Sequence, residues 1–447
     1  MTQLKKSLGL FDCIALLVGI TIGSGIFATP QIIAGYLDSF STIIILWIGV
    51  AMFVFTGALI YGELGSRFPK TGGEYVYIQK AFGPFWGFLF GWAQLVIIRT
   101  SPAAGLSLIT ANYLGYFLPM DQTSKMIVAS GIIIIFGFIN YLGVERASLY
   151  NKMSSSIKIG GLFLFALVGL IMMNGDFNQL SISETAMGKL GSTGNIVAAL
   201  MLVLFSFIGW DRVGYVAGEM KNPAKVIPQS MISGIAVIIL LYLSSNLLYH
   251  SVLGMEGMRN STIVASDTAI KLFGPIGAGL ISIMVIISAT GSINGTIMSA
   301  SRVYYAMARD GLMFKWLNHV DSKYQSPTHA IMAHCIWGIA LILIRQNFET
   351  IVSGMVFAIL IFYGFTTVAF FKFRQTNSGE EDGYRLPFYP VLPGVYLAGI
   401  IILVLLRAYY ETGKTVHDLT FVLTGIPVYF LLFKKNESPI VIGNDIT

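Results

Sequence analysis

The chain of 447 residues is 55% hydrophobic and only 11% charged, and its mean hydropathy is +0.74. A soluble protein carries about 25% charged residues, so this composition excludes a set of soluble domains and predicts a polytopic membrane bundle. The net charge of +6 does not indicate a nucleic-acid partner, because the basic residues lie in short loops and form no continuous stripe.

The residue pattern gives no indication of catalysis or of a metal centre. Cys13 and Cys335 lie in apolar segments, and the five histidines have no metal-ligand spacing. An enzyme in the membrane would need clustered ligands or a nucleophile with its base. We therefore expect no metal, no cofactor and no enzymatic activity. The basic start, MTQLKKSLGL, leads into an apolar segment too long for a signal peptide, so we expect no cleaved leader.

Twelve apolar segments are long enough to cross a membrane, because a spanning helix needs about 20 residues. They lie at residues 11–35, 40–66, 84–117, 124–144, 149–173, 194–218, 229–252, 273–300, 328–345, 349–373, 390–410 and 416–433. An even number of spans places both termini on one side. Eighteen loop lysines and arginines lie on that side and seven on the other, so both termini are predicted to be cytoplasmic.

The first span contains the stretch GITIGSGIFATP, residues 19–30, with three glycines, a serine and a closing proline. An unpaired N–H or C=O costs several kcal/mol in hydrocarbon, so a helix is broken at membrane depth only where protein, water or a ligand takes over the freed groups. Close packing between helices is the alternative reason for glycines in the first span.

Two cations lie inside the third and fifth spans. Arg99 is near the predicted external end of the third span, where we expect it to reach the headgroups or line an outer vestibule. Lys158 lies roughly 9 Å deeper in the fifth span than Lys152, at 1.5 Å per residue. An intramembrane lysine suggests a function, although snorkelling toward the headgroups remains the alternative.

The sixth span is interrupted by SFIGWDR, residues 206–212, much as the first is interrupted by its glycines. The two interruptions are five spans apart in chain order, and an odd shift reverses direction across the membrane. We therefore predict two inverted repeats, 1–173 and 174–375, followed by helices 11 and 12 and a cytoplasmic tail in 376–447.

Two facing breaks are suited to one kind of ligand. A half-helix that begins after a break presents free N–H groups and a positive dipole end to a carboxylate. A half-helix that ends at a break offers carbonyl groups to an ammonium group. An α-amino acid zwitterion satisfies both. A channel, in contrast, would need rings of pore-lining groups.

Polar residues in other spans suggest gating. Tyr242 and Asn246 are four residues apart and so share a helix face, where hydrogen bonding between helices and gating are equally open interpretations. Four charged residues at predicted cytoplasmic ends suggest an inner-gate salt-bridge network: Glu63, Glu219, Arg302 and Arg309.

Four motifs together resemble one transporter family. They are IGSGIF in the first span, KTGGEYVYIQKAFGPFWGFLFGW (70–92), FSFIGWDRVGYVAGEMKNPAKVIPQS (205–230) and GSINGTIMSASRVYYAMARDGL (291–312). The chain resembles the amino acid–polyamine–organocation transporters, and within them the L-type amino acid transporters and the bacterial serine/threonine and alanine/serine/cysteine exchangers. The resemblance implies an all-α polytopic membrane protein of 12 transmembrane helices, with a 5+5 inverted-repeat fold, discontinuous helices 1 and 6, and added helices 11–12.

The resemblance also implies where the substrate binds. Its carboxylate would meet the backbone of Ser24, Gly25 and Ile26, with help from the Ser24 hydroxyl. Its ammonium group would meet carbonyls near Thr21 and Ile22 and that of Phe205, which matches the family's aromatic lid. The predicted substrate-binding residues are Thr21, Ile22, Ser24, Gly25, Ile26, Phe205, Ser206, Ile208 and Gly209. The predicted coupling and gating residues are Lys158, Phe205, Trp210, Tyr242 and Asn246.

Two positions indicate the type of transport. Lys158 matches the family lysine that links helices 1 and 8 where sodium-driven relatives bind a cation, which implies sodium independence. Ile208 stands where the L-type pattern commonly has glycine, and a branched side chain there favours alanine, serine, threonine or cysteine over larger amino acids. We predict a sodium-independent exchanger of small neutral L-amino acids that works by alternating access. A proton-coupled importer is the alternative, because a buried lysine can titrate.

The predicted partners are small neutral amino acids and the lipid bilayer, without nucleic acid. Mammalian L-type light chains join a glycoprotein through a cysteine between helices 3 and 4, and this loop has no cysteine here. We therefore expect no obligatory glycoprotein subunit, and a multi-pass location in the cell membrane of a bacterium.

Overall fold

The computed structural model describes residues 8–23, 25–68, 73–172, 192–379 and 383–433. Within these ranges the elements are helices, and one isolated backbone bridge joins Leu8 to Met220. Eleven of the described helices or helix pairs are long and apolar enough to cross a membrane. The other predicted span, 84–117, is divided by a π-helical turn. The prediction of an all-α polytopic fold is confirmed.

The divided spans are the first, third, sixth and twelfth. The first consists of α1 (Leu10–Thr21), α2 (Gly25–Ala28) and α3 (Pro30–Tyr36). The third consists of α6 (Pro84–Ala93), the π-helical turn η1 (Gln94–Ile98) and α7 (Thr100–Leu114). The sixth consists of α10 (Thr193–Phe207) and the 3₁₀ helix η4 (Trp210–Glu219). The twelfth consists of α16 (Thr412–Leu423), α17 (Gly425–Val428) and the π-helical turn η6 (Tyr429–Phe433).

The remaining spans are not divided in this way. They are α4 (Phe40–Arg67), α8 (Gln122–Tyr141), α9 (Val144–Met172), α11 (Pro223–Asn260), α12 (Val264–Arg309), α13 (Thr328–Arg345), α14 (Phe348–Gln375) and α15 (Val391–Tyr410). Two short helices lie between spans: α5 (Glu74–Phe82) and η5 (Lys315–Asn318). Two glycines with a positive φ angle bend the helices on either side of one connection. Gly254 bends α11 near its C-terminal end, and Gly274 bends α12 near its N-terminal end.

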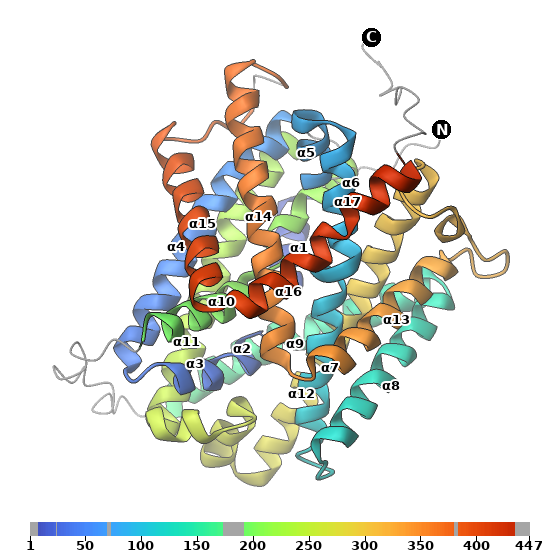
Figure 1. The fold of residues 1–447 in the computed structure, drawn as a ribbon. Helices are drawn as coiled ribbons and strands as arrows, with labels where there is room; N and C mark the ends of the chain where they lie inside the picture. Colours follow the sequence, from blue (N-terminus) through green and yellow to red (C-terminus); the bar gives the residue numbers. More distant parts are fainter. Residues whose placement is uncertain (1–7, 24, 69–72, 173–191, 380–382, 434–447) are drawn as a thin grey trace.

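The two broken spans cross each other in opposite directions. α1 packs against η4, whereas α2 and α3 pack against α10 (Figure 1). The first half of one span therefore lies beside the second half of the other. This arrangement fits an inverted relationship, while the division of the chain at residues 173 and 375 stays a prediction.

Long helices enclose the crossing. α11 packs along both α1 and α4, and α12 packs along α7 and α9 (Figure 1). The side chains that face this centre are fully buried, among them Leu17, Ile22, Ile26 and Tyr242. The breaks therefore lie inside protein rather than against lipid, as non-helical backbone at membrane depth requires.

A buried carboxylate joins α4 to α14. Glu63 is fully buried and accepts hydrogen bonds from Arg67 Nε at 2.7 Å, from Arg374 Nη2 at 2.6 Å and from the backbone N–H of Leu386 at 2.7 Å. Two guanidinium groups and a backbone donor thus satisfy one carboxylate, which is the condition under which a buried charge is tolerated.

The prediction that Arg302 and Arg309 of α12 join a salt-bridge network with Glu63 is wrong. Arg302 donates to the carbonyl oxygen of Met298 in its own helix, and Arg309 forms an exposed pair with Asp310. α14, rather than α12, brings a cation to Glu63. The side chain of Glu219 lies outside the described part of the chain.

Glu63→Gln should therefore destabilise the protein strongly, because it leaves two partly or fully buried guanidinium groups without their anion. Removing one partner of such a cluster costs about 3–5 kcal/mol. Thermal unfolding in detergent measures the change. Arg309→Gln is the matched control, since its ion pair is exposed and should contribute less than about 1 kcal/mol. Equal melting temperatures for the two variants would contradict this role of Glu63.

Candidate functional site

The first break occupies the residues after Thr21. Ile22 has φ −71° and ψ 81°, which ends α1, and α2 begins at Gly25. Ser24, a predicted carboxylate ligand, lies outside the described residues. Beyond the break, Thr29 N–H donates to Gly25 O at 2.8 Å and Ile33 N–H donates to Thr29 O at 2.9 Å. These bonds join α2 and α3 into one bent half-helix.

The second break occupies Ile208 and Gly209. Ile208 has ψ 133° and donates its N–H to Phe205 O at 3.0 Å, and Gly209 has φ 119°. This left-handed conformation strains residues with a side chain, which explains the glycine at this point. The 3₁₀ helix η4 then starts at Trp210.

Two glycines let the breaks touch. A Cβ atom on Gly25 would lie 2.8 Å from the Cα of Ser206, and one on Gly209 would lie 3.3 Å from the Cα of Thr21. The hydroxyl groups of Thr29 and Ser206 are also hydrogen-bonded across the crossing, at 3.0 Å. The structure therefore brings together the predicted residues Thr21 and Gly25 of the first span and Ser206 and Gly209 of the sixth.

Tyr242 connects both breaks. Its hydroxyl group lies 2.8 Å from Ser206 O and 3.1 Å from Thr21 O, and its side chain is fully buried. A phenol has one proton to share between the two carbonyls, and Thr21 O also accepts the N–H of Gly23 at 2.7 Å. Asn246, one turn later, donates to the carbonyl oxygen of Tyr242 at 2.8 Å and reaches the breaks through that residue.

Aromatic side chains pack together on both sides of the break in the sixth span. Before the break, Phe205 makes an edge contact with Phe348 of α14, with ring centroids 5.4 Å apart. After the break, Trp210 packs against Tyr61 at 4.8 Å and Tyr363 at 5.4 Å. Between these pairs Ile22 and Ile26 are fully buried, whereas Ile208 is only half-buried.

Lys158 lies inside the bundle. Its side chain is 3% exposed, and its ammonium group donates to Ser292 Oγ of α12 at 3.3 Å. α9 also packs against α1. The snorkelling interpretation was therefore wrong, because the ammonium group points to a neutral partner on another helix. The described residues contain no group of three side chains able to ligate a metal.

Sequence reasoning missed or misplaced several residues at this centre. Arg99 was expected to reach the headgroups or to line an outer vestibule. The headgroup alternative is wrong, because Arg99 is 5% exposed and donates to Gln94 Oε1 at 2.7 Å, directly after the π-helical turn η1. Thr29 and Ser292 were not selected, although both stand in the quoted stretches. Neither carries a signal of its own, since a lone hydroxyl in a membrane helix is common.

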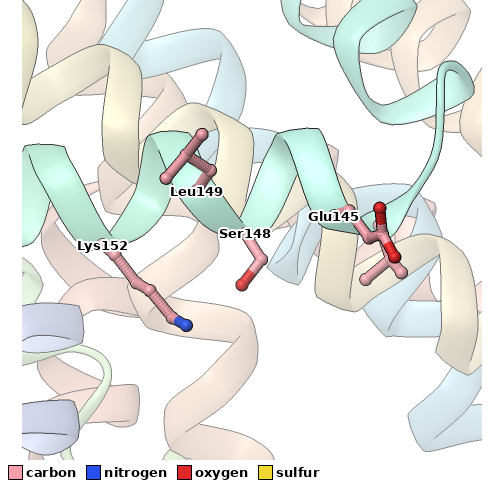
Figure 2. A pocket seen from close by; sticks show the side chains of 5 residues that line it. Glu145, Ser148, Leu149 and Lys152 are labelled. Atoms are coloured by element: carbon pink, nitrogen blue, oxygen red, sulfur yellow. The ribbon is translucent and has the colours of Figure 1, made fainter.

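A surface pocket lies away from this centre. Figure 2 shows Glu145, Ser148, Leu149 and Lys152 along the first turns of α9. Most of these side chains are exposed, and none belongs to the predicted site. The pocket therefore gives no support for substrate binding there.

The comparison with protein families decides the class. The family model for amino acid permeases matches residues 8–433. The chain belongs to the amino acid permease family. This membership makes it a membrane transporter of amino acids rather than an enzyme.

Known relatives align with this permease over nearly its whole length. The serine/threonine exchanger SteT of Bacillus subtilis (strain 168) is 30% identical over 97% of this chain and 98% of its own. The b(0,+)-type amino acid transporter 1 of Mus musculus is 28% identical over 96% of this chain and 88% of its own. The large neutral amino acids transporter small subunit 2 of the same species is 27% identical, over 96% and 81%. The predicted resemblance is confirmed.

Gly25→Ala should separate the two breaks of the permease, because its Cβ would collide with the main chain of Ser206. Overpacking of this kind costs about 1–3 kcal/mol, so amino acid uptake should fall roughly 10- to 100-fold. Uptake into proteoliposomes measures the effect. Gly19→Ala is the control, since its Cβ would meet Ser155 at an ordinary 3.5 Å. Normal uptake by Gly25→Ala would rule out a functional contact between the breaks.

Proposed function

We propose that this permease is a sodium-independent exchanger of small neutral L-amino acids that works by alternating access. The observation that carries the proposal is the meeting of two broken helices at one buried point. Main-chain groups of residues 21–23, 25–26 and 205–209 lie at that point, and no charged side chain competes for it among the described residues of these two breaks. A zwitterion matches such paired main-chain dipoles.

The carbonyl groups at the crossing support this choice. Thr21 O and Ser206 O share the single proton of the Tyr242 hydroxyl. An ammonium group brings three donors, so it would satisfy these carbonyls better than the phenol does. The substrate carboxylate would lie at the N–H groups that open the half-helix from Gly25, as predicted. Tyr242 would then report the presence of substrate by losing one of its acceptors.

Lys158 supports sodium independence. A fixed ammonium group between α9, α1 and α12 supplies the positive charge that a bound cation would otherwise supply. Its hydrogen bond to Ser292 connects α9 to the helix that passes the first break. The same burial also favours the second candidate function, a proton-coupled importer, since a lysine with a neutral partner can give up its proton.

Ile208 supports small substrates. Its half-buried side chain lies at the second break, while the buried Ile22 and Ile26 lie at the first. Three branched side chains leave little room for a large substrate side chain. The similarity to a serine/threonine exchanger, at 30% identity, agrees with this size limit.

The proposed cycle needs no subunit or cofactor. We propose a cell-membrane location with both termini in the cytoplasm, and two inverted repeats that move relative to each other around the crossing. The pairs Phe205–Phe348 and Trp210–Tyr61 would separate in turn, the first toward the outside and the second toward the cytoplasm.

Counterflow in proteoliposomes tests the exchange. Internal unlabelled serine should accelerate the uptake of labelled serine, and replacing sodium with choline should leave the rate unchanged. A pH dye inside the liposomes should record no proton entry with the substrate. Uptake that ignores internal serine but acidifies the lumen would favour the proton-coupled importer, and a sodium requirement would contradict the role given to Lys158.

Ile208→Gly should widen the substrate range. Removing one branched side chain from a substrate pocket changes discrimination by about 1–3 kcal/mol, so leucine should inhibit serine uptake at least roughly tenfold better than in the wild type. Competition by leucine and by alanine in the same assay separates size from general activity. Unchanged selectivity would show that Ile208 does not limit the pocket.

A further inference from the structure

Tyr36, the last residue of α3, connects the first span to two other spans. Its hydroxyl group donates to Glu349 Oε1 of α14 at 2.5 Å. Its carbonyl oxygen accepts a hydrogen bond from Asn195 Nδ2, in the first turn of α10, at 3.2 Å. The side chain of Tyr36 is half-buried, and a hydroxyl that donates to an ionised carboxylate forms one of the stronger hydrogen bonds in proteins. Both broken spans therefore meet α14 at the ends that lie away from their breaks.

Arg259 of α11 holds the same end of α3. Its Nε atom donates to Ala34 O at 3.0 Å, and its Nη2 atom donates to Leu37 O at 3.2 Å. The last carbonyl groups of a helix have no partner within that helix, so an arginine can supply the missing donors. Hydrogen bonds to the main chain thus join α3 to both α10 and α11 at this end of the molecule. We treat these three ends as one unit, which Tyr36 connects to α14.

Glu349 lies next to the aromatic contact that covers the crossing. It follows Phe348, whose ring packs against Phe205 of the sixth span with the centroids 5.4 Å apart. The hydrogen bond and the ring contact therefore join the same two parts, the first turn of α14 and the broken spans. Tyr36 is roughly 16 Å along the first span from Gly25, at 1.5 Å per residue. A separation that broke both contacts would uncover the crossing from this end.

Charged residues at the junction of α15 and α16 hold Glu349 from its other side. Lys414 Nζ lies 3.9 Å from Glu349 Oε1 and donates to Glu411 Oε1 at 2.6 Å. The second oxygen of Glu411 accepts a hydrogen bond from Arg407 Nε at 3.2 Å. The signs of these four charges alternate, so each one attracts its neighbours.

This row of charges ends in a buried cluster. Arg407 and Asp418 are fully buried, and Arg407 Nη2 donates to Asp418 Oδ2 at 2.6 Å. Arg345 of α13 donates to the other oxygen of Asp418 through Nη2, and to Thr350 O in the first turn of α14 through Nη1, at 3.0 Å. Gly354 makes room for the cluster, because a Cβ atom there would lie 2.5 Å from Asp418 Oδ1. α13, α15 and α16 thus fix the start of α14.

We propose that the hydrogen bond between Tyr36 and Glu349 is a latch on the crossing, and that α15 and α16 anchor it by holding Glu349 in place. The inference rests on the proposed function, which places this end of the broken spans outside the cell. While the latch is closed, Phe205 stays on Phe348 and the crossing is covered. When it opens, α3, α10 and the end of α11 move away from α14 together, and an amino acid reaches the crossing. This gives the two helices that follow the predicted repeats a part in transport.

Distances between two spin labels test the latch in the full-length protein in nanodiscs. Labels on Gly35→Cys of α3 and Ile344→Cys of α13 lie on exposed positions, and both native cysteines are buried. Tyr36→Phe removes a hydrogen bond to a charged group, so the ratio of long to short distances should rise about tenfold. Tyr116→Phe is the matched control, because its hydroxyl donates to Pro275 O between α7 and α12. A distribution in Tyr36→Phe equal to that of the wild type, or an equal change in Tyr116→Phe, would overturn the proposal.

The same labels test the anchor. Lys414→Gln removes the charge that connects Glu349 to α16, so the ratio of long to short distances should rise roughly two- to fivefold, as for a partly exposed ion pair. Lys271→Gln is the control, since this exposed lysine donates to the carbonyl oxygen of Val252 rather than to an acid. If Lys414→Gln and Lys271→Gln both kept the wild-type distances, the anchoring role of α16 would be wrong.

Serine exchange in proteoliposomes tests the consequence for transport. Each exchange requires closure on the α3 side, so Tyr36→Phe should exchange serine several-fold more slowly than the wild type, and Tyr116→Phe should exchange it as the wild type does. A normal rate in Tyr36→Phe, together with shifted distances, would remove the role of the latch in transport. If the wild type exchanges no amino acid, the proposed function fails, while the spin-label distances still decide whether the latch exists.

Discussion

The rest of this structure depends on one constraint: main-chain groups released inside a membrane protein must find partners. Helix 1 loses its regular bonding after Thr21, and helix 6 loses it at Ile208. The two gaps meet because Gly25 and Gly209 have no side chain to hold them apart. The Tyr242 hydroxyl shares one proton between Thr21 O and Ser206 O, and Gly23 N–H is a second donor to Thr21 O. We therefore propose the crossing as the place where a small ligand with several donors and acceptors binds.

Two buried charges near this point are held in different ways. Glu63 is paired with Arg67 and Arg374, and it joins α4 to α14. Within the described part of the chain, the Lys158 ammonium group donates to the Ser292 hydroxyl, and we propose that its charge orients the helices beside the first break.

The sequence was sufficient for the fold because spans depend on composition and breaks depend on glycine. The breaks at residues 22–25 and 208–209 follow from conspicuous glycines in apolar runs. Side-chain partners were harder to predict, because they depend on which helices become neighbours. Arg99 reads as an interfacial cation until the π-helical turn directs it to Gln94. Glu63 has several arginines near it in the loop pattern, and only packing selects Arg374 of α14 over Arg302 of α12.

A structure of the permease in lipid nanodiscs with serine bound, by electron cryomicroscopy, tests the central claim most directly. The account predicts serine between residues 21–26 and 205–209, with its ammonium group at Thr21 O and Ser206 O and its carboxylate at the N–H groups that follow Ser24. The Tyr242 hydroxyl should have moved away from at least one of its two carbonyl partners. Serine bound elsewhere, with both breaks closed on Tyr242 as they are without it, would contradict the account.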